Sequence, residues 1–311
     1  MNNTSSLFIT DPFHNLNPEK DTTILWMQEI AAMGGEVLQC EIQDLFYSDG
    51  LVQAKIGRVI NPLDQPLVIE LLKTTRVLKS IDYVYMRKDP PVDNNYMNAL
   101  HLLSQAETEG ANIMNRPSAL QKFNEKILAL RFSQWMPDTQ VISTEEDFKG
   151  FKKKHSSIIL KPLDGMGGES IYKFEELDAQ ALSIFKALTN NHLTMVMVQN
   201  FVPEIYEGDY RILIIHGKPF PIALARIPQG DSFKGNLAAG GKGVARELNV
   251  QQREVADEVG AFLLKEGVSF AGIDMIGNYL TEINITSPTG ARQILNQTQQ
   301  NPMQEFLQAL K

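Results

Sequence analysis

The chain has 311 residues, of which 43% are hydrophobic and 21% charged, and its formal net charge is −8. This composition is typical of a folded protein with two or three domains, and the negative charge argues against nonspecific binding to nucleic acid. The single cysteine, Cys40, excludes an intrachain disulfide and a cysteine metal cluster. We see no signal-like start and no apolar run long enough to span a membrane, so we expect a cytoplasmic protein.

Residues 1–121 are predicted to form an α/β domain with a parallel sheet. The domain opens with a strand, a helix and a second strand, at residues 6–10, 17–35 and 36–42. This βαβ order favours parallel strands, and Asn17 is the expected N-cap of the helix. A hairpin, a strand, a helix capped by Asp93 and a last strand should follow, at residues 45–56, 81–91, 93–110 and 111–117.

Charged residues end the predicted strand at 81–91. Arg87, Lys88 and Asp89 stand there, just before two prolines. Ligands of open α/β sheets gather at the carboxyl ends of strands, so these residues are candidates for substrate binding. The alternative is an ordinary salt bridge at a strand end.

Two further units are predicted at residues 122–200 and 201–311, and antiparallel strands dominate both. The first should contain two helices and three strands, within residues 118–137, 143–155, 156–174 and 194–204. Its second helix should be capped by Ser143 or Thr144. The last unit should contain two strand pairs and a helix between them, at residues 209–228, 267–286 and 250–266.

A glycine loop follows an apolar strand that carries Lys161. Gly165, Gly167 and Gly168 fit neither G-x-x-x-x-G-K-[ST] nor G-x-G-x-x-G, because Ser170 occupies the last position and a strand follows the loop. A glycine-rich hairpin can still place backbone N–H groups over phosphates, with the lysine as a point charge. Lys126 is a second candidate phosphate ligand. The alternative is a mobile turn beside a lysine whose ammonium reaches solvent.

Two arginines lie in the strands of the predicted hairpin at 209–228. Buried unpaired charge is costly, so Arg211 and Arg226 need partners. The planar guanidinium matches phosphate or carboxylate oxygens. A structural ion pair with a glutamate is the alternative.

Oxygen donors stand in the apolar strands of residues 267–286. Asp274, Glu282 and Asn284 are a suitable set for Mg²⁺, a hard cation that commonly bridges carboxylates to nucleotide phosphates. A two-residue turn at Gly277–Asn278 without a bulge would put the two carboxylates on opposite faces. We therefore predict an odd-numbered loop or a bulge, for example with Ile276 paired to Leu280, so that Asp274 lies opposite Glu282.

A long glycine-rich loop at residues 227–243 is predicted to be a lid. Its glycines are Gly230, Gly235, Gly240, Gly241 and Gly243. Long loops in compact domains are commonly functional, and a lid would exclude water from a reactive intermediate.

In this order, the motifs resemble those of an ATP-grasp ligase, and more narrowly those of the bacterial glutathione synthetases. The most specific strings are LKPLDGMGG, ARIPQG and GNLAAGG, and the match runs through the whole chain. The resemblance implies an N-terminal parallel α/β domain followed by two α+β subdomains whose antiparallel sheets clamp ATP. It also implies a homotetramer.

The resemblance further implies a reaction. ATP would phosphorylate the cysteinyl carboxylate of γ-glutamylcysteine, and glycine's amine would then attack the acyl phosphate to form glutathione. A free carboxylate has a poor leaving group, so activation is needed, and the enzyme's part is positioning and charge stabilisation. A dipeptide-type ligase acting on another acid and amine is the alternative, and a non-catalytic nucleotide-binding regulator is disfavoured because the metal set and both arginines are present.

The family's roles carry over to the matching positions of this sequence. Phosphate binding is implied for Lys126, Lys161, Gly165, Met166, Gly167 and Gly168, and adenine binding for Gln199, Asn200, Phe201 and Val202. Asp209 is implied at the ribose, and Arg211 and Arg226, with Lys161, as the catalytic cations. Two Mg²⁺ ions, or Mn²⁺, would be held by Asp274, Glu282 and Asn284. Substrate contacts are implied for Arg226, Ser287, Arg87, Lys234 and Gly240.

The chain departs from the family at two lid positions. The family commonly has arginine where this sequence has Lys234 and Lys242. Lysine keeps the charge but loses the bidentate fork, so we expect weaker lid contacts.

Overall fold

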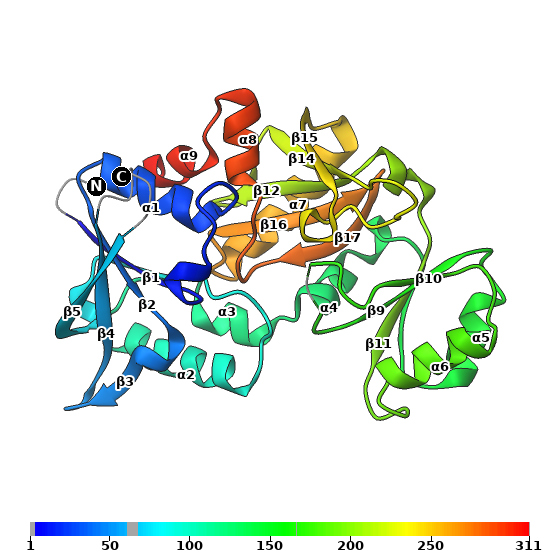
Figure 1. The fold of residues 1–311 in the computed structure, drawn as a ribbon, viewed down its shortest axis with the longest axis horizontal. Helices are drawn as coiled ribbons and strands as arrows, with labels where there is room; N and C mark the ends of the chain where they lie inside the picture. The colour runs from blue at the N-terminus through cyan, green and yellow to red at the C-terminus, as the bar shows by residue number, and fades with distance from the viewer. Residues whose placement is uncertain (1–3, 61–67, 166, 311) are drawn as a thin grey trace.

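The computed structural model describes residues 4–60, 68–165 and 167–310, which form three sheets with helices around them. The N-terminal sheet lies at one end, a six-stranded sheet in the middle and a four-stranded sheet at the other end (Figure 1). None of the helices in this described part combines the length and apolar character that a membrane span requires.

The N-terminal sheet has seven strands in the order β3-β4-β2-β1-β6-β7, with β5 also paired to β4. Strands β1, β2, β6 and β7 are parallel, and β3, β4 and β5 pair antiparallel. Their bounds are Ser5–Ile9, Glu36–Cys40, Leu45–Ser48, Leu51–Ile60, Val68–Val77, Tyr83–Met86 and Ile113–Met114 for β1 to β7. The fully buried β1 explains the apolar run that predicted it.

The helices of this domain test the predicted caps. Helix α1 (Thr22–Ala32) begins after Asp21, whose side chain accepts a bond from the N–H of Thr23 at 2.6 Å. The prediction of Asn17 as its N-cap is therefore wrong, because Asn17 instead closes a separate turn by accepting from the N–H of Glu19. Helix α2 (Asn94–Thr108) is capped by Asp93 as predicted. Short 3-10 turns occupy Phe13–Asn15, Ile42–Asp44 and Leu78–Ser80.

The helix predicted at 118–137 is divided into three pieces. These are α3 (Pro117–Lys122), α4 (Glu125–Ala129) and the 3-10 turn η4 (Leu130–Trp135). The division occurs because Asn124 starts a new helix, its side chain accepting from the N–H groups of Lys126 and Ile127. Lys126 thereby lies in the first turn of α4, close to the glycine loop.

The four-stranded sheet has the antiparallel order β10-β9-β11-β8 and its own core. Its strands are β8 (Thr139–Ile142), β9 (Ile158–Pro162), β10 (Tyr172–Phe174) and β11 (Val196–Asn200). Helices α5 (Glu145–Lys152), capped by Thr144, and α6 (Ala179–Leu188) pack against it. The short, partly polar β8 was missing from the prediction of three strands.

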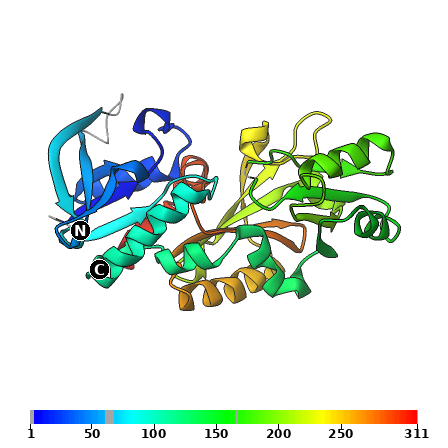
Figure 2. The same ribbon diagram turned by 90° about the horizontal axis from the view of Figure 1, so that it is seen from below.

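The central sheet has the order β15-β14-β12-β16-β17, with β13 paired to β12. The strands β12 to β17 span Asp209–Ile215, Lys218–Pro219, Ile222–Ile227, Lys242–Glu247, Phe270–Ile276 and Tyr279–Asn284. The 3-10 turns η5 (Pro203–Glu207) and η6 (Leu237–Ala239) precede β12 and β15. Helix α7 (Val250–Lys265) runs along one face, and α8 (Ala291–Thr298) and α9 (Pro302–Gln308) cover the other (Figure 2).

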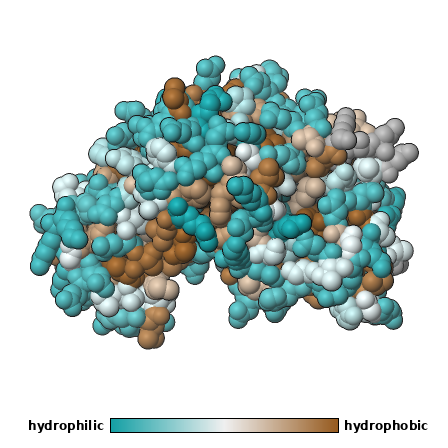
Figure 3. Space-filling model, turned by 180° about the vertical axis from the view of Figure 1, so that it is seen from behind, coloured by the Kyte–Doolittle hydropathy of each residue, from teal (hydrophilic) through white to brown (hydrophobic). Residues whose placement is uncertain are grey.

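Hydrophobic packing joins the first and last parts of the chain. Ile212 and Leu213, adjacent in β12, belong to two different clusters, one on each face of the sheet, and both clusters extend into residues 1–121. The four-stranded sheet is not part of either cluster. Seen from behind, a notch in the lower edge of the surface separates this smaller subdomain from the rest (Figure 3).

Candidate functional site

Two pockets meet between the three sheets. The first, with an open volume of about 890 Å³, lies between the four-stranded and central sheets. The second, of about 930 Å³, extends toward the N-terminal domain. Four residues line both, namely Gly165, Gly167, Asn236 and Glu282, so the pockets adjoin at this point.

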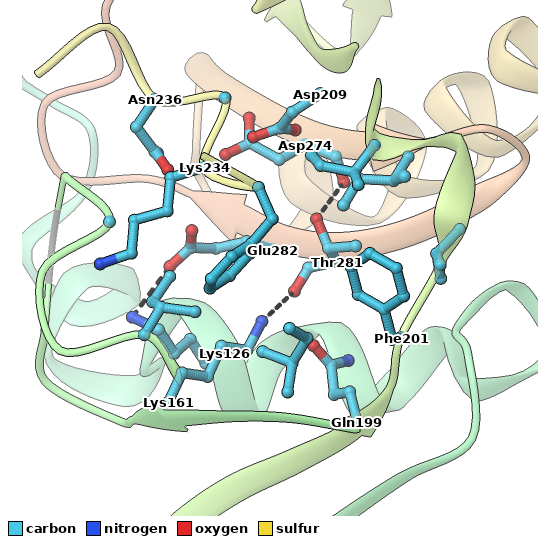
Figure 4. A pocket seen from close by; sticks show the side chains of 18 of the residues that line it. Lys126, Lys161, Gln199, Phe201, Asp209, Lys234, Asn236, Asp274, Thr281 and Glu282 are labelled. Carbon is cyan, nitrogen blue, oxygen red and sulfur yellow. Dashed lines mark hydrogen bonds and ion pairs between the residues drawn. The ribbon is translucent and has the colours of Figure 1, made fainter. Parts of the chain in front are cut away.

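Lys126 and Lys161 converge on the junction (Figure 4). The ammonium of Lys126 lies 3.0 Å from Glu282 and donates to the carbonyl of Gly165 at 2.5 Å. Lys161, from β9, donates to the carbonyl of Thr281 at 3.2 Å. Both lysines are buried, and burial lowers the pKa of Lys161 to about 8, although Glu282 opposes the shift. These cations have partners that an anionic ligand could replace.

The glycine loop is a hairpin between antiparallel β9 and β10, as predicted. Gly167 and Gly168 have φ values of 62° and 83°, which favour glycine. A Cβ on Gly168 would lie 2.7 Å from Oδ1 of Asn236, so this loop and the long loop of residues 227–243 touch closely. Met166 lies outside the described residues.

Apolar side chains form a slot in part of the first pocket. Gln199, Asn200, Phe201 and Val202, predicted to bind adenine, all line it, together with Pro137, Ile159, Ile205 and Ile276. The side chain of Gln199 is fixed by donating to Thr139 at 2.9 Å. A slot with apolar walls and few polar groups suits a flat aromatic base.

Arg211, Arg226, Asp209 and Asp274 form one buried charge cluster. Arg211 holds Asp274 with two bonds of 2.5 and 2.9 Å, and Arg226 lies 2.9 Å from Asp274 and also bonds Asp209. Burial alone would raise the pKa of Asp274, but the two arginines hold it well below its usual range. The alternative of a structural ion pair is thus realised, with aspartates rather than a glutamate as partners. Both arginines also line the second pocket.

Asp209 lines the first pocket, where the ribose was expected. Its carboxylate is directed at Arg226, and its Oδ1 is buried without a hydrogen-bond partner among the described residues. Burial raises its pKa to about 6, opposed by Arg226. Because Asp209 contacts Arg226, it belongs to the arginine cluster.

A β-bulge aligns the metal-ligand candidates, as predicted. Asp274 lies opposite Glu282, whereas the next pair is Met275 with Leu280, so Thr281 is the extra residue of the bulge. The hydroxyl of Thr281 donates to the carbonyl of Asp274 at 3.0 Å. The suggested pairing of Ile276 with Leu280 is wrong, because Ile276 pairs with Tyr279 across a two-residue turn.

The donors at this position fit a magnesium ion. Asp274, Glu282 and Asn284 lie on one face of neighbouring strands, and the Asn284 amide donates to Asp274 at 3.3 Å. Within residues 4–60, 68–165 and 167–310 no cluster of three or more acidic, histidine or cysteine side chains could hold a metal. Two carboxylates and one amide oxygen would supply only part of a coordination shell, phosphate oxygens would supply more, and Asp274 would also keep its contacts with Arg211 and Arg226.

Of the remaining candidates for substrate binding, two line the pockets and two do not. Ser287 lines the second pocket and Lys234 the first. Arg87 and Gly240 line neither of them. The Arg87 guanidinium is buried, donating to Thr23 at 3.1 Å and to the carbonyl of Pro288 at 2.9 Å, so it supports the segment that carries Ser287.

Sequence reasoning did not single out Glu125, Asn236 and Thr281 as site residues, although all three line the pockets. Asp89, a substrate-binding candidate at the end of its strand, lines the second pocket. The proximity of Glu125 to Lys126 in the sequence was the available signal. Glu125 was overlooked because a continuous helix was predicted here. In the structure the helix breaks at Asn124, which makes Glu125 the first residue of α4.

The predicted loop of residues 227–243 is shorter in the structure, because Ile227 pairs with Lys242 and Gly243 with Arg226 in β14 and β15. The loop that remains, residues 228–241, crosses both pockets. Phe233, Lys234 and Gly235 line the first, and Leu237 and Ala238 the second. A Cβ on Gly235 would lie 2.3 Å from the carbonyl oxygen of Arg226. Close packing therefore explains this glycine, in addition to the flexibility that composition suggested.

Two family models match the chain. They are the prokaryotic glutathione synthetase N-terminal domain, over residues 5–121, and the prokaryotic glutathione synthetase ATP-grasp domain, over residues 125–299. Similar curated proteins include glutathione synthetases of Pseudomonas aeruginosa (41% identical; 92% of this chain and 90% of that protein) and Neisseria meningitidis (42%; 94% and 93%). That of Nitrosomonas europaea is 40% identical over 98% of this chain and 96% of that protein.

Solved structures resemble the fold at low sequence identity. D-cycloserine synthetase DcsG superposes with a TM-score of 0.66 at 13% identity, covering 98% of each chain. The ATP-grasp ligase PsnB, complexed with a minimal precursor, Mg and ADP, gives 0.63 at 15% identity, covering 100% of this chain and 98% of that one. The likeness shows that the three-sheet arrangement is an ATP-grasp fold.

Proposed function

The chain belongs to the prokaryotic glutathione synthetase family, and from this premise we propose how its residues divide the work of the reaction. The enzyme is an ATP-dependent ligase that joins γ-glutamylcysteine and glycine to form glutathione. One observation carries our proposal: the two pockets share Glu282 as a lining residue. ATP fills the first pocket and the two acceptor substrates fill the second, so the γ-phosphate is transferred at their junction.

ATP binding exchanges the partners of the two lysines. Lys126 and Lys161 now contact Glu282 and the carbonyls of Gly165 and Thr281. Phosphate oxygens replace these contacts, and the glycine loop covers the phosphates. The base lies in the apolar slot of residues 199–202, and Asp209 stands at its ribose side. Release of Glu282 from Lys126 frees a carboxylate for metal.

Asp274, Glu282 and Asn284 would hold two Mg²⁺ ions, or Mn²⁺, which would neutralise phosphate charge. Arg211 and Arg226 bind the transferred phosphoryl group and the acyl phosphate that it forms with the dipeptide. Their paired carboxylate, Asp274, fixes both guanidinium groups before the substrate arrives. Ser287 contacts the dipeptide, with Arg87 behind it. Lys234 and Gly240 approach the substrates only when the loop closes.

We expect ATP affinity to fall as the pH rises above about 8. In the free enzyme the pKa of Lys161 is lowered to about 8, so at higher pH this amine is uncharged. Bound phosphate favours the protonated form, so binding takes up a proton and affinity falls by up to about tenfold per pH unit. Calorimetric titration with ATP across this range is the measurement. Lys161→Arg, which stays charged, should lose the pH dependence, and Lys161→Ala should bind weakly throughout. A pH-independent affinity of the unaltered enzyme contradicts the assignment.

Residues 227–243 are a lid that orders over bound ATP and dipeptide. Trypsin should cut the free enzyme after Lys234 or Lys242, and the two ligands together should slow that cut, which mass spectrometry of the fragments would measure. Cleavage at the same rate with and without ligands argues against closure. A Lys234→Ala variant should hydrolyse more ATP per ligation, because a weaker lid lets water reach the intermediate.

The sharpest test of the proposed reaction course uses γ-glutamylcysteine carrying ¹⁸O in its cysteinyl carboxylate. With ATP, Mg²⁺ and glycine, we expect glutathione by mass, with one ¹⁸O kept in the new amide and one transferred to phosphate. Glutathione without label in phosphate refutes the acyl phosphate. Absence of product in a folded enzyme would favour a ligase of another acid and amine.

We further propose a cytoplasmic homotetramer.

A further inference from the structure

Glu125 is a carboxylate of the second pocket that the roles above leave unused. Its Oε1 accepts three hydrogen bonds, from the N–H of Ile285 at 2.7 Å and from the N–H and hydroxyl of Thr286 at 2.9 Å each. Its Oε2 has no partner among the residues that the structure describes. One oxygen therefore anchors the side chain to the end of β17, and the other is available to a ligand in the pocket that Glu125 lines.

Three acidic residues line this pocket, and they differ in position and in occupation. Glu282 is held by Lys126 and is a metal-ligand candidate. Asp89 lies on the side of the N-terminal domain, where its charged neighbours are Arg87, Asp11 and Asp21. Glu125 lies on the side of the junction, because it directly precedes Lys126, whose ammonium contacts Glu282 and the carbonyl of Gly165, and because α4 packs against β17.

The chemistry of the reaction distinguishes two ammonium groups. Glycine's nitrogen must approach the acyl carbon, next to the transferred phosphoryl group. The ammonium of γ-glutamylcysteine lies at the opposite end of the dipeptide from that carbon. An acidic residue close to the junction is therefore placed for glycine, and one on the far side for the dipeptide.

We propose that Glu125 binds the ammonium group of glycine through Oε2 and holds its nitrogen toward the acyl phosphate. This inference rests on the proposed positions of ATP and dipeptide. A carboxylate with one oxygen fixed by three donors is a preorganised acceptor, and its charge selects an amine substrate.

Glu125→Gln is the decisive variant, because glutamine keeps one oxygen for Ile285 and Thr286 but presents an amide N–H₂ to the pocket. We expect the KM for glycine to rise about 10- to 100-fold, the range for loss of a hydrogen bond to a charged group. The KM values for ATP and dipeptide should change less than about twofold on the same scale. Glu145→Gln is the matched control, since Glu145 is likewise the first residue of a helix but pairs with Lys149 on the surface.

The reaction with hydroxylamine gives a second measurement, because a structural defect in the site would slow this reaction as well. It is uncharged at neutral pH, so it can attack the acyl phosphate without a carboxylate to bind an ammonium group. Glu125→Gln should therefore still form the hydroxamate of the dipeptide at close to the unaltered rate. Asp89→Asn should instead raise the KM for the dipeptide and leave that for glycine unchanged.

Three results would overturn the inference. They are an unchanged KM for glycine in Glu125→Gln, an equal loss of the hydroxylamine reaction, or an effect on glycine from Asp89→Asn alone. Failure of the proposed function is recognised separately, because the unaltered enzyme would then form neither glutathione nor hydroxamate.

Discussion

Replacing Arg226 by alanine is expected to lower the rate of ligation about a hundred- to thousand-fold, the usual effect of removing one preorganised donor from a developing charge. Arg226 is buried, lines the second pocket and is fixed by Asp209 and Asp274. Arg211 is already bonded to Asp274 through two nitrogens, so we expect that it does not take over the contacts of Arg226. The measurement is kcat for glutathione formation.

The same substitution also removes the cation that compensates two buried carboxylates. Breaking a buried ion pair costs roughly 3–5 kcal/mol, so chemical denaturation must accompany the kinetics. Arg226→Lys retains a charge but not the fork, and it should fold better while remaining slow. Arg58→Ala, which loses only a surface pair with Glu36, is the control. Near-normal turnover of a folded Arg226→Ala variant would exclude the catalytic role.

Asp274→Asn is expected to affect both stability and activity. Its carboxylate compensates both arginines and is a metal-ligand candidate, so the loss of unfolding free energy should again be about 3–5 kcal/mol. Ligation should fall to near background, because the arginines lose their fixed orientation and the metal loses a charged ligand. Equilibrium denaturation and the Mg²⁺ dependence of turnover are the measurements.

Glu282→Gln separates these two roles. Glu282 pairs with Lys126 alone and is more exposed than Asp274, with 21% of the side-chain area accessible against 3%. It should therefore cost less stability than Asp274→Asn, yet raise the Mg²⁺ requirement strongly. Full activity of Glu282→Gln at ordinary Mg²⁺ concentration would refute the metal assignment, and equal destabilisation by both variants would refute the structural distinction between them.

Part of the site could be predicted because local rules decide it. The glycine hairpin after Lys161 and the bulge that brings Asp274 opposite Glu282 follow from turn chemistry and from the period of two along a strand. The cap at Asp93 was predicted for the same reason. The cap at Asp21 was not predicted, because Asn17 and Asp21 are both acceptable locally and only the packing of α1 selects between them.

The sequence by itself determined the family and most of the strands, although it did not predict β5 or β8, and it showed which charged residues lie in apolar strands. Only the tertiary structure decided which partners these charged residues have. Arg226 pairs with Asp209 and Asp274, and Arg87 donates to the carbonyl of Pro288. Glu125 accepts a hydrogen bond from Thr286, which is 161 residues away in the sequence. The physical reason is that burying any unpaired charge costs free energy, so a charged residue in an apolar strand shows only that a partner is needed. Which residue becomes the partner depends on which distant strands lie next to each other in the fold.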